Sequence, residues 1–341
     1  MLTRIEPADF GLQEAADLIR RGELVAFPTE TVYGLGGDAG NASAIERIYQ
    51  VKGRPGNNPL IVHVPDVSAA RDYTSEFPAI AAVLAQAFWP GPLTLVLQRN
   101  DQICPAVSAG KTTVAIRCPN NPVAQALLQA AGRPIAAPSA NCSGHTSPTT
   151  AQHVLDELAG RIALILDGGL CKVGLESTVV DVTGSSPVIL RPGAVTQAML
   201  AQCLTDAGFS VQVTVAAKYA GNSANEPLKS PGQLESHYAP RTVAYRFYAS
   251  DQPGLNAYLL TLRNQRIGML CLEGFAVPAG MAKILILPAV EQACARALYG
   301  ALRELDAADC DVLLIQCPEN NFGVWAAIED RLRRATKELP L

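Results

Sequence analysis

The segment that most constrains this chain is residues 26–37, which read Ala-Phe-Pro-Thr-Glu-Thr-Val-Tyr-Gly-Leu-Gly-Gly. The apolar run from Leu24 to Phe27 predicts a short buried strand, which Pro28 ends. Hydroxyl and carboxyl side chains follow, and then three glycines, which permit a positive φ and the close approach of a ligand to the backbone. This pattern is typical of a ligand loop at the end of a sheet strand. A tight strand-to-helix turn without any ligand accounts for it equally well.

The composition is that of a globular chain. Its 341 residues are 49% hydrophobic and 17% charged, which is enough apolar material for two domains with their own cores. No apolar run approaches the ~20 residues of a membrane span, and the N-terminal residues contain no apolar signal segment. The nine cysteines are scattered without a Cys-x-x-Cys pair. This usage fits reduced thiols, so we expect a cytoplasmic protein.

The net charge and the incomplete phosphate-binding motifs argue against several classes of function. A net charge of −4 gives no overall basic field of the kind that nucleic-acid-binding proteins carry. The four histidines lie far apart, so we expect no metal held by the protein itself. Gly110-Lys111-Thr112 resembles the end of a P-loop, but Pro105 stands where a glycine is required. A dinucleotide-binding fingerprint beginning at residue 34 fails in the same way, because Ala39 replaces its third glycine.

Helical and strand patterns alternate along the chain, which predicts an α/β protein. The first domain is expected at residues 1–210. Residues 211–242 are rich in Gly, Asn, Ser and Pro and show neither period, so they predict a linker. The α/β pattern then restarts, and residues 243–341 predict a smaller, mostly parallel sheet with helices around it. Its expected strands are 243–248, 267–272, 283–287 and 311–316, and its expected helices are 253–263, 289–307 and 322–335.

Cationic side chains stand in loops or at predicted strand ends of the first domain, namely at Lys52, Arg54, Arg117 and Arg191. Small hydroxyl and amide side chains accompany them on other loops, and these are Ser139, Asn141, Ser143, Ser147, Ser177 and Thr178. Arginine suits bidentate capture of carboxylate or phosphate, and lysine suits a point contact with phosphate. Each residue alone has a simpler explanation, such as a cation at a solvated helix C-terminus. Together they predict a basic, hydroxyl-lined concavity for an anionic ligand, which we interpret as a nucleotide.

Motifs between residues 24 and 240 resemble those of the YrdC-like family, and the whole chain resembles its long, two-domain form. In chain order they are Pro-Thr-Glu-Thr-Val-Tyr-Gly-Leu-Gly (28–36), Lys-Gly-Arg-Pro (52–55), Asn-Pro-Leu-Ile-Val-His (58–63), Trp-Pro-Gly-Pro-Leu-Thr (89–94), Val-Ala-Ile-Arg-Cys-Pro (114–119), Ala-Pro-Ser-Ala-Asn-Cys-Ser-Gly (137–144), Glu-Ser-Thr-Val (176–179), Arg-Pro-Gly (191–193), Ser-Pro-Gly (230–232) and His-Tyr-Ala-Pro (237–240). The resemblance implies a twisted, open, mixed sheet with a basic concave cavity. It also implies a smaller, Rossmann-like α/β domain at the C-terminus, on position and pattern alone.

The resemblance implies that the chain is a nucleotidyltransferase. Such an enzyme makes L-threonylcarbamoyl-AMP from L-threonine, bicarbonate and ATP and releases pyrophosphate. This is the first step of threonylcarbamoyladenosine modification beside the anticodon of tRNA. By the same resemblance, the catalytic residues are implied to be Lys52, Arg54, Ser139 and Asn141. L-Threonine would be bound by Thr31, His63, Arg117, Ala137 and Ser177. ATP, with Mg²⁺ on its phosphate oxygens, would be bound by Arg54, Asn58, Thr113, Ser139, Ser147, Arg191 and Tyr238.

The resemblance also implies partners. A downstream tRNA threonylcarbamoyl transferase would take the product, a weak contact with tRNA is allowed, and no membrane is involved. Residues 230–240 are interpreted as a lid that excludes water from the cavity. The alternative function is a non-catalytic RNA-binding module that uses the same basic cavity. The net charge of −4 argues against that alternative, because such binding depends on contacts with phosphates.

Overall fold

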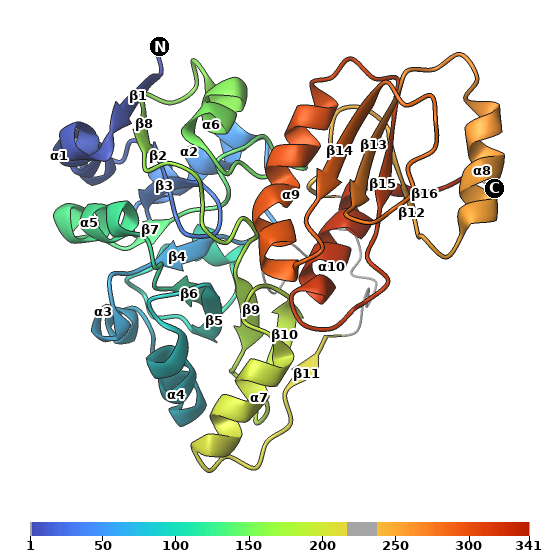
Figure 1. Ribbon diagram of the computed structural model, residues 1–341. Helices are drawn as coiled ribbons and strands as arrows, with labels where there is room; N and C mark the ends of the chain where they lie inside the picture. Colours follow the sequence, from blue (N-terminus) through green and yellow to red (C-terminus); the bar gives the residue numbers. More distant parts are fainter. Residues whose placement is uncertain (1, 217–236, 341) are drawn as a thin grey trace. The chain divides into compact units, whose positions relative to one another are not determined.

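The computed structural model describes residues 2–216 and 237–340 (Figure 1). Contacts divide the described chain into two compact units. The first contains residues 2–143, 148–172 and 176–216, and the second contains residues 144–147, 173–175 and 237–340. None of the described helices has the length and apolar character needed to cross a bilayer.

The first unit is built on an eleven-stranded mixed sheet with the order β1-β8-β2-β3-β7-β4-β6-β5-β9-β10-β11. The strands are β1 (Arg4–Pro7), β2 (Val25–Phe27), β3 (Gly34–Asp38), β4 (Ile61–His63), β5 (Leu93–Gln98), β6 (Thr113–Arg117), β7 (Ile135–Ala136), β8 (Leu164–Asp167), β9 (Thr178–Asp181), β10 (Val188–Arg191) and β11 (Thr214–Val215). The helices are α1 (Ala8–Arg20), α2 (Ala42–Lys52), α3 (Val67–Asp72), α4 (Ala79–Phe88), α5 (Pro122–Ala131), α6 (Ala151–Leu158) and α7 (Gln197–Asp206), with a 3₁₀ turn η1 (Pro105–Ser108). The α/β class expected from the residue patterns and the mixed sheet implied by the family resemblance are both confirmed.

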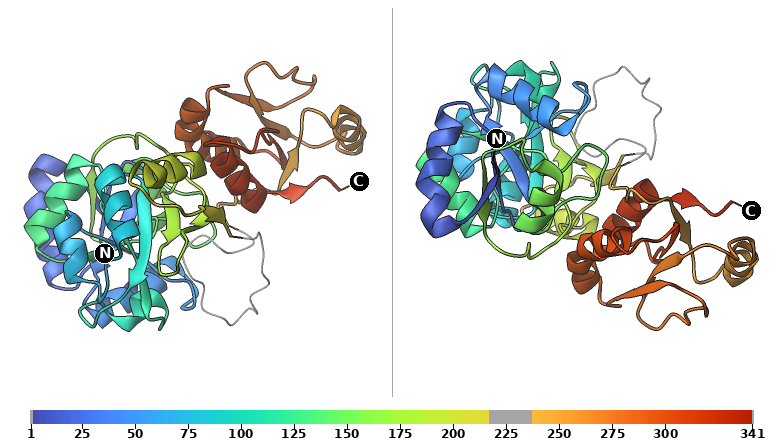
Figure 2. Two further views of the ribbon diagram at one scale, coloured as in Figure 1. Left: turned by 90° about the horizontal axis from the view of Figure 1, so that it is seen from below. Right: turned by 90° about the horizontal axis from the view of Figure 1, so that it is seen from above.

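Strand β2 shows how this sheet is covered on both faces. Successive side chains of a strand point to opposite faces. Val25 and Phe27 pack with buried residues of α1 and α5, and these two helices lie side by side (Figure 2). Ala26 belongs to the other core, to which α2, α4, α6 and α7 contribute. Because both faces of β2 are covered, the strand is apolar throughout rather than alternating.

The three glycines that follow the opening turn lie in a strand, and not in a loop or in a strand-to-helix turn as expected. Strand β3 pairs antiparallel with β2, so the segment is strand, turn and strand. None of these glycines has a positive φ. A Cβ on Gly36 would stand 2.8 Å from both Ile135 Cγ2 and Phe27 Cε1. The glycine is therefore required by close side-chain packing against β3.

A third apolar cluster lies on the central strands of the same sheet. It consists of Ile61, Val96, Ala115 and Val179, with Leu190 packed against it. The residues that alternate with them, such as Val62 and Ile116, belong to the core that the helices cover. The central strands thus present a small apolar patch on the face opposite to those helices.

The second unit contains a five-stranded sheet with the order β14-β13-β15-β12-β16, in which every neighbouring pair is parallel. Its strands are β12 (Ala244–Phe247), β13 (Ile267–Leu272), β14 (Lys283–Leu287), β15 (Val312–Gln316) and β16 (Lys337–Glu338), and its helices are α8 (Gln252–Thr261), α9 (Glu291–Asp306) and α10 (Trp325–Ala335). Helix α8 packs on one face of this sheet, and α9 and α10 lie on the other (Figure 1). The expected parallel sheet with surrounding helices is confirmed.

Short elements account for most differences from the sequence prediction. Strands β1, β3 and β16 were not expected. Strand β11 lies within the segment interpreted as a linker and pairs with β10 in parallel. Residues 230–236 of the expected lid lie outside the described residues.

Candidate active site

Strands β4 and β6 place several of the predicted ligand residues on one face of the sheet. The two strands are parallel neighbours, and His63 pairs with Arg117 at their C-terminal ends. Since side chains alternate along a strand, Thr113 and Arg117 share the face that carries the central apolar patch. Thr94 of β5 is paired with Arg117 from the other side. The apolar patch therefore lies at the base of the site, where we call it the apolar floor, and the polar residues lie at its ends.

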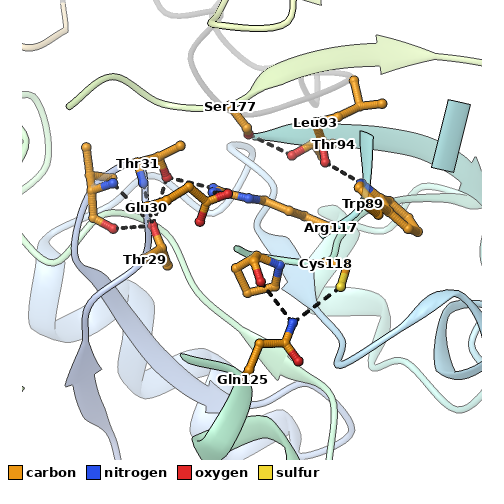
Figure 3. A network of polar contacts seen from close by, with 12 residues as sticks. Thr29, Glu30, Thr31, Trp89, Leu93, Thr94, Arg117, Cys118, Gln125 and Ser177 are labelled. Atoms are coloured by element: carbon orange, nitrogen blue, oxygen red, sulfur yellow. Dashed lines mark hydrogen bonds and ion pairs between the residues drawn. The ribbon is translucent and has the colours of Figure 1, made fainter. Parts of the chain in front are cut away.

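Arg117 is held by the turn that joins β2 to β3 (Figure 3). Its Nη1 donates to the hydroxyl of Thr31 at 2.7 Å. Its Nη2 forms an ion pair with the Glu30 carboxylate, with 2.7 Å between Nη2 and Oε1. The hydroxyl of Thr29 donates to the carbonyl of Val32 at 2.6 Å and accepts from the amides of Thr31 and Val32. Hydrogen bonds within the turn therefore fix its conformation. The turn places the Thr31 hydroxyl and the Glu30 carboxylate against Arg117.

Four buried side chains of the first unit have polar atoms without a hydrogen-bond partner among the described residues. These atoms are both carboxylate oxygens of Glu30, Nε and Nη2 of Arg117, Nδ1 of His63 and Nδ2 of Asn58. Buried polar atoms in folded proteins are nearly always paired, because an unpaired one costs about 1–3 kcal/mol. Three of these residues gather at the C-terminal ends of β4 and β6 and in the adjoining turn. A polar ligand at this place would satisfy them.

His63 is neutral in this setting. Burial, and then the positive charge of Arg117, lower its pKa from 6.5 to about 3. Its ring meets Phe27 edge to face, with 6.0 Å between the ring centroids. At neutral pH the imidazole therefore acts as a hydrogen-bonding group without a charge.

Ser177 and Arg191 form a second hydrogen-bonded group. The Ser177 hydroxyl lies 2.7 Å from that of Thr94 (Figure 3). Arg191 donates to the Ser177 carbonyl from Nε at 3.1 Å and from Nη2 at 3.0 Å, and to its hydroxyl at 3.2 Å. The pairing of β10 with β9 is irregular between Ile189 and Arg191. Such an irregularity changes the direction of a side chain, and here it accompanies the turn of Arg191 toward Ser177.

Lys52 joins the loop at residues 139–141. It was expected in a loop, but it is the last residue of α2, which Gly53 ends in the left-handed conformation (φ 61°). Lys52 is only 3% exposed, so it is not the solvated helix-end cation that the sequence also allowed. Its Nζ donates to the carbonyl of Ser139 at 2.5 Å, to the carbonyl of Asn141, and to Asn141 Oδ1 at 3.3 Å. The Ser139 hydroxyl donates to the same Oδ1 at 2.5 Å.

The environment of Lys52 brings the pKa of its amine close to neutral pH. Burial, and then repulsion by Arg54, lower its pKa from 10.5 to about 7. An anion placed beside Nζ would favour the protonated form. We therefore expect the Lys52 amine to gain a proton when a phosphate binds beside it.

Arg54 organises the loop that leads into β4. Its Nε donates to the carbonyl of Asn58 at 3.0 Å, and its Nη2 donates to Asn58 Oδ1 at 2.6 Å and to the carbonyl of Pro59 at 2.8 Å.

The predicted ligand residues extend along β6. Thr113 begins this strand and Arg117 ends it, so about 13 Å separate them at ~3.3 Å per residue. The predicted threonine and ATP residues therefore spread along the strands rather than around one point.

Ala137 connects the two ends of the site. Its amide donates to the carbonyl of Ile61 at 2.8 Å, so any backbone contact with a ligand falls to its own carbonyl oxygen. Ser139 follows two residues later and pairs with Gly34 in a β-bridge. The chain thus runs directly from the His63 region to the Lys52 region.

Two predicted ATP residues, Ser147 and Tyr238, belong by their contacts to the second unit. Arg303 donates to the Ser147 carbonyl at 3.4 Å. The Tyr238 ring stacks on that of Tyr299 at 5.8 Å between centroids, and the Arg331 guanidinium lies 5.2 Å from its centre. Tyr238 has a φ of 65°, which is uncommon for a residue with a Cβ.

Sequence reasoning missed Glu30 and Thr94 as site residues. Glu30 was visible as a carboxyl residue between two threonines directly after a strand, and Thr94 stood at the start of a strand.

The second unit contains a cavity of about 340 Å³ at the C-terminal ends of its strands, lined among others by Leu272, Gln316 and Trp325. No predicted site residue lines that cavity.

Comparison with known proteins gives the family. The Sua5/YciO/YrdC family model, described as telomere recombination, matches residues 17–193, and a model described as threonylcarbamoyl-AMP synthase, C-terminal domain, matches residues 195–336. A threonylcarbamoyl-AMP synthase of Bacillus subtilis is 42% identical over 334 residues, which cover 95% of this chain and 92% of that protein. One of Pyrococcus abyssi is 37% identical over 338 residues, with 98% and 95% covered.

A solved structure matches nearly the whole length of the chain. The crystal structure of P. abyssi Sua5 complexed with L-threonine has a TM-score of 0.86 and 36% identity, and the match covers 98% of both chains. One family model covers more than half of the sequence, and full-length relatives match nearly all of it. The chain therefore belongs to the YrdC-like family, in the form that carries the C-terminal domain of the threonylcarbamoyl-AMP synthases.

Proposed function

We propose that this chain synthesises L-threonylcarbamoyl-AMP from L-threonine, bicarbonate and ATP and releases pyrophosphate. The observation that carries the proposal is the group of unpaired buried atoms on Arg117, Glu30 and His63, joined by residues 137–141 to the buried Lys52. Such an arrangement suits an amino acid at one end and phosphates at the other. The names of the relatives, and the L-threonine complex of the P. abyssi protein, support the same function.

At the amino-acid end, the Arg117 guanidinium grips the threonine carboxylate. A guanidinium binds a carboxylate through two parallel hydrogen bonds, and Nε and Nη2 of Arg117 are the two donors without a hydrogen-bond partner. Thr31, His63 and Ser177, with the backbone of Ala137, complete the proposed threonine site. Neutral His63 adds a hydrogen bond without a second positive charge.

At the phosphate end, Lys52 and Arg54 offset the charge that builds up when pyrophosphate leaves. Ser139 and Asn141 hold Lys52 in place, and Asn58 and Pro59 hold Arg54. Fixed donors of this kind stabilise a transition state because they need no reorganisation during the reaction. Lys52, Arg54, Ser139 and Asn141 are the proposed catalytic residues. The remaining proposed ATP contacts are Asn58, Thr113, Ser147, Arg191 and Tyr238.

ATP enters as its Mg²⁺ complex in this proposal. The cluster around Lys52 is built from carbonyl, amide and hydroxyl groups, whereas Mg²⁺ prefers carboxylate and phosphate oxygens. The phosphate oxygens of ATP would therefore carry the ion, which would neutralise part of their charge. The residues of the chain position the phosphates around it.

The reaction needs no covalent intermediate with the protein. The threonine ammonium first releases one proton to solvent. The neutral amine then attacks the carbon of bicarbonate, which gives a carbamate and water. A carbamate oxygen then attacks the α-phosphate and expels pyrophosphate. Holding three reactants in line supplies much of the acceleration. The burial of Lys52, Arg117 and His63 keeps water from the labile carbamate.

The wider setting follows from the same proposal. A tRNA threonylcarbamoyl transferase consumes the product, and contact of this chain with tRNA is weak. Residues 1–210 act as the catalytic domain, residues 211–242 as a linker and lid, and residues 243–341 as an additional domain. The nine free thiols support a reducing compartment, and we place the reaction in the cytoplasm.

Pyrophosphate release from ATP tests the proposal, with each common amino acid supplied in turn, with and without bicarbonate. Release that requires both L-threonine and bicarbonate is expected. Release that ignores either compound would overturn the proposal. Salt-dependent tRNA binding without any release would instead favour the RNA-binding alternative.

A further inference from the structure

The Glu30 carboxylate is buried in a way that the proposed roles of its neighbours leave unexplained. It is 4% exposed, and neither of its oxygens accepts a hydrogen bond from any described residue. Among the described residues its charged partner is Arg117, whose Nη2 lies 2.7 Å from Oε1 without hydrogen-bond geometry. A buried carboxylate needs donors, because an unsatisfied one loses the whole of its hydration. A ligand that carries hydrogen-bond donors would supply what the Glu30 carboxylate lacks.

Glu30 and Arg117 together form a pair of opposite charges side by side, at one end of the apolar floor (Figure 3). A free α-amino acid carries an ammonium and a carboxylate on the same carbon atom. The pair matches that pattern of charges, because each of its members has buried polar atoms that lack hydrogen bonds. A simple anion would satisfy Arg117 but would meet repulsion from Glu30.

We propose that Glu30 binds the α-ammonium group of the amino-acid substrate while Arg117 binds its carboxylate. This assignment rests on the proposed function, and it deepens it by giving the site a means of selecting zwitterions. An ammonium has three N–H donors, which can supply both oxygens of the Glu30 carboxylate. The nitrogen is thereby fixed in position, and it attacks bicarbonate after it has released one proton to solvent. Glu30 is a substrate-binding residue of the reaction.

The Glu30 carboxylate also distinguishes the two cationic groups of the site, Arg117 and Lys52. Lys52 is surrounded by carbonyl, amide and hydroxyl groups, and its hydrogen-bond partners among the described residues include no carboxylate. Arg117 has Glu30 beside it, so phosphate or bicarbonate is disfavoured there. The charges thus direct ATP to one end of the site and the amino acid to the other.

Calorimetric titration of the full chain tests the proposal with two ligands, L-threonine and 3-hydroxybutanoate, which lacks only the α-amino group. In the wild-type protein the loss of the ammonium should weaken binding by about 10- to 100-fold, as expected for a hydrogen bond to a charged group. Glu30→Gln should weaken L-threonine by a similar factor and leave 3-hydroxybutanoate unchanged or tighter. ATP affinity should change by less than about threefold.

The outcomes separate this proposal from the function on which it rests. If Glu30→Gln weakens both ligands equally, Glu30 acts only by holding Arg117, and the proposal is wrong. If wild-type protein binds both ligands equally, it is wrong whether or not the variant folds. Normal affinity of Glu30→Gln for L-threonine, with threonine-dependent pyrophosphate release intact in the wild type, overturns the Glu30 assignment alone. Failure of the wild type to bind L-threonine overturns the proposed function together with it.

Discussion

The burial of Lys52 leads to a prediction whose size can be worked out. Its pKa is lowered from 10.5 to about 7, chiefly by burial and then by Arg54. Above that pH the protonated fraction falls about tenfold for each pH unit, to roughly one hundredth at pH 9. Since kcat/KM reports on the free enzyme, kcat/KM for ATP should fall in the same proportion if protonated Lys52 receives the phosphates.

Replacing the lysine removes both the donor and its titration. Lys52→Met should lower kcat by about two to three orders of magnitude, as the loss of a preorganised charge donor does. It should also change the stability profile. The folded pKa lies below the unfolded one, so the unfolded state binds more protons between about pH 7 and 10.5, and wild-type stability rises with pH in that window. The rise is at most roughly 5 kcal/mol, and Lys52→Met should lack it.

The assay is pyrophosphate release at ATP concentrations below KM, measured from neutral to alkaline pH, with chemical denaturation in the same buffers. Lys172→Met is the matched control, because Lys172 is exposed on the same unit. It should retain both the activity and the alkaline decline. A Lys52→Met protein with near-normal turnover, or with the same alkaline decline in kcat/KM, would refute the reasoning.

Three further predictions follow from other contacts. A site that hydrogen-bonds the substrate hydroxyl should accept serine as the best alternative, since one methyl is worth ~1–3 kcal/mol, and reject valine; competition assays in which valine outperforms serine would contradict the threonine site. His63 has a folded pKa of about 3 against 6.5 unfolded, so stability should be lost as the pH falls below about 6.5, and acid denaturation of His63→Asn should show a shallower loss. Gly36→Ala should cost about 1–3 kcal/mol in denaturant, because its Cβ would stand 2.8 Å from Phe27 and Ile135, whereas Gly56→Ala, with open space around it, should change stability by less than about 0.5 kcal/mol. An equal cost at the two glycines would show that packing does not explain β3.

The strands of the core could be predicted from the sequence, and β3 could not, for a physical reason. Short apolar runs such as residues 61–64 and 93–97 show buried strands directly, and their alternation places Thr113 and Arg117 on one face. Residues 34–38 are mostly glycine, which has low strand propensity. This segment becomes a strand because large neighbours such as Phe27 fill the space above it, and that depends on tertiary structure.

The candidate site was predictable as a set of residues, while its electrostatics were not. Lys52 at the end of a helix is normally solvated, and only the fold shows that residues 139–141 enclose it. Glu30 could equally have been a surface carboxylate in a turn, and its burial beside Arg117 depends on the pairing of distant strands. Arg191 reaches Ser177 next to an irregularity in β10 that no spacing in the sequence indicates.

Mass spectrometry of the adenylate formed with carbon-labelled bicarbonate tests the central claim most directly. The account predicts an adenylate that contains threonine and carries the label in its carbamate carbon. Wild-type protein and Lys172→Met should form it at similar rates, and Lys52→Met should form it about two to three orders of magnitude more slowly. An unlabelled adenylate in which threonine is joined directly to AMP would contradict the account, because the carbamate would then play no part in the reaction.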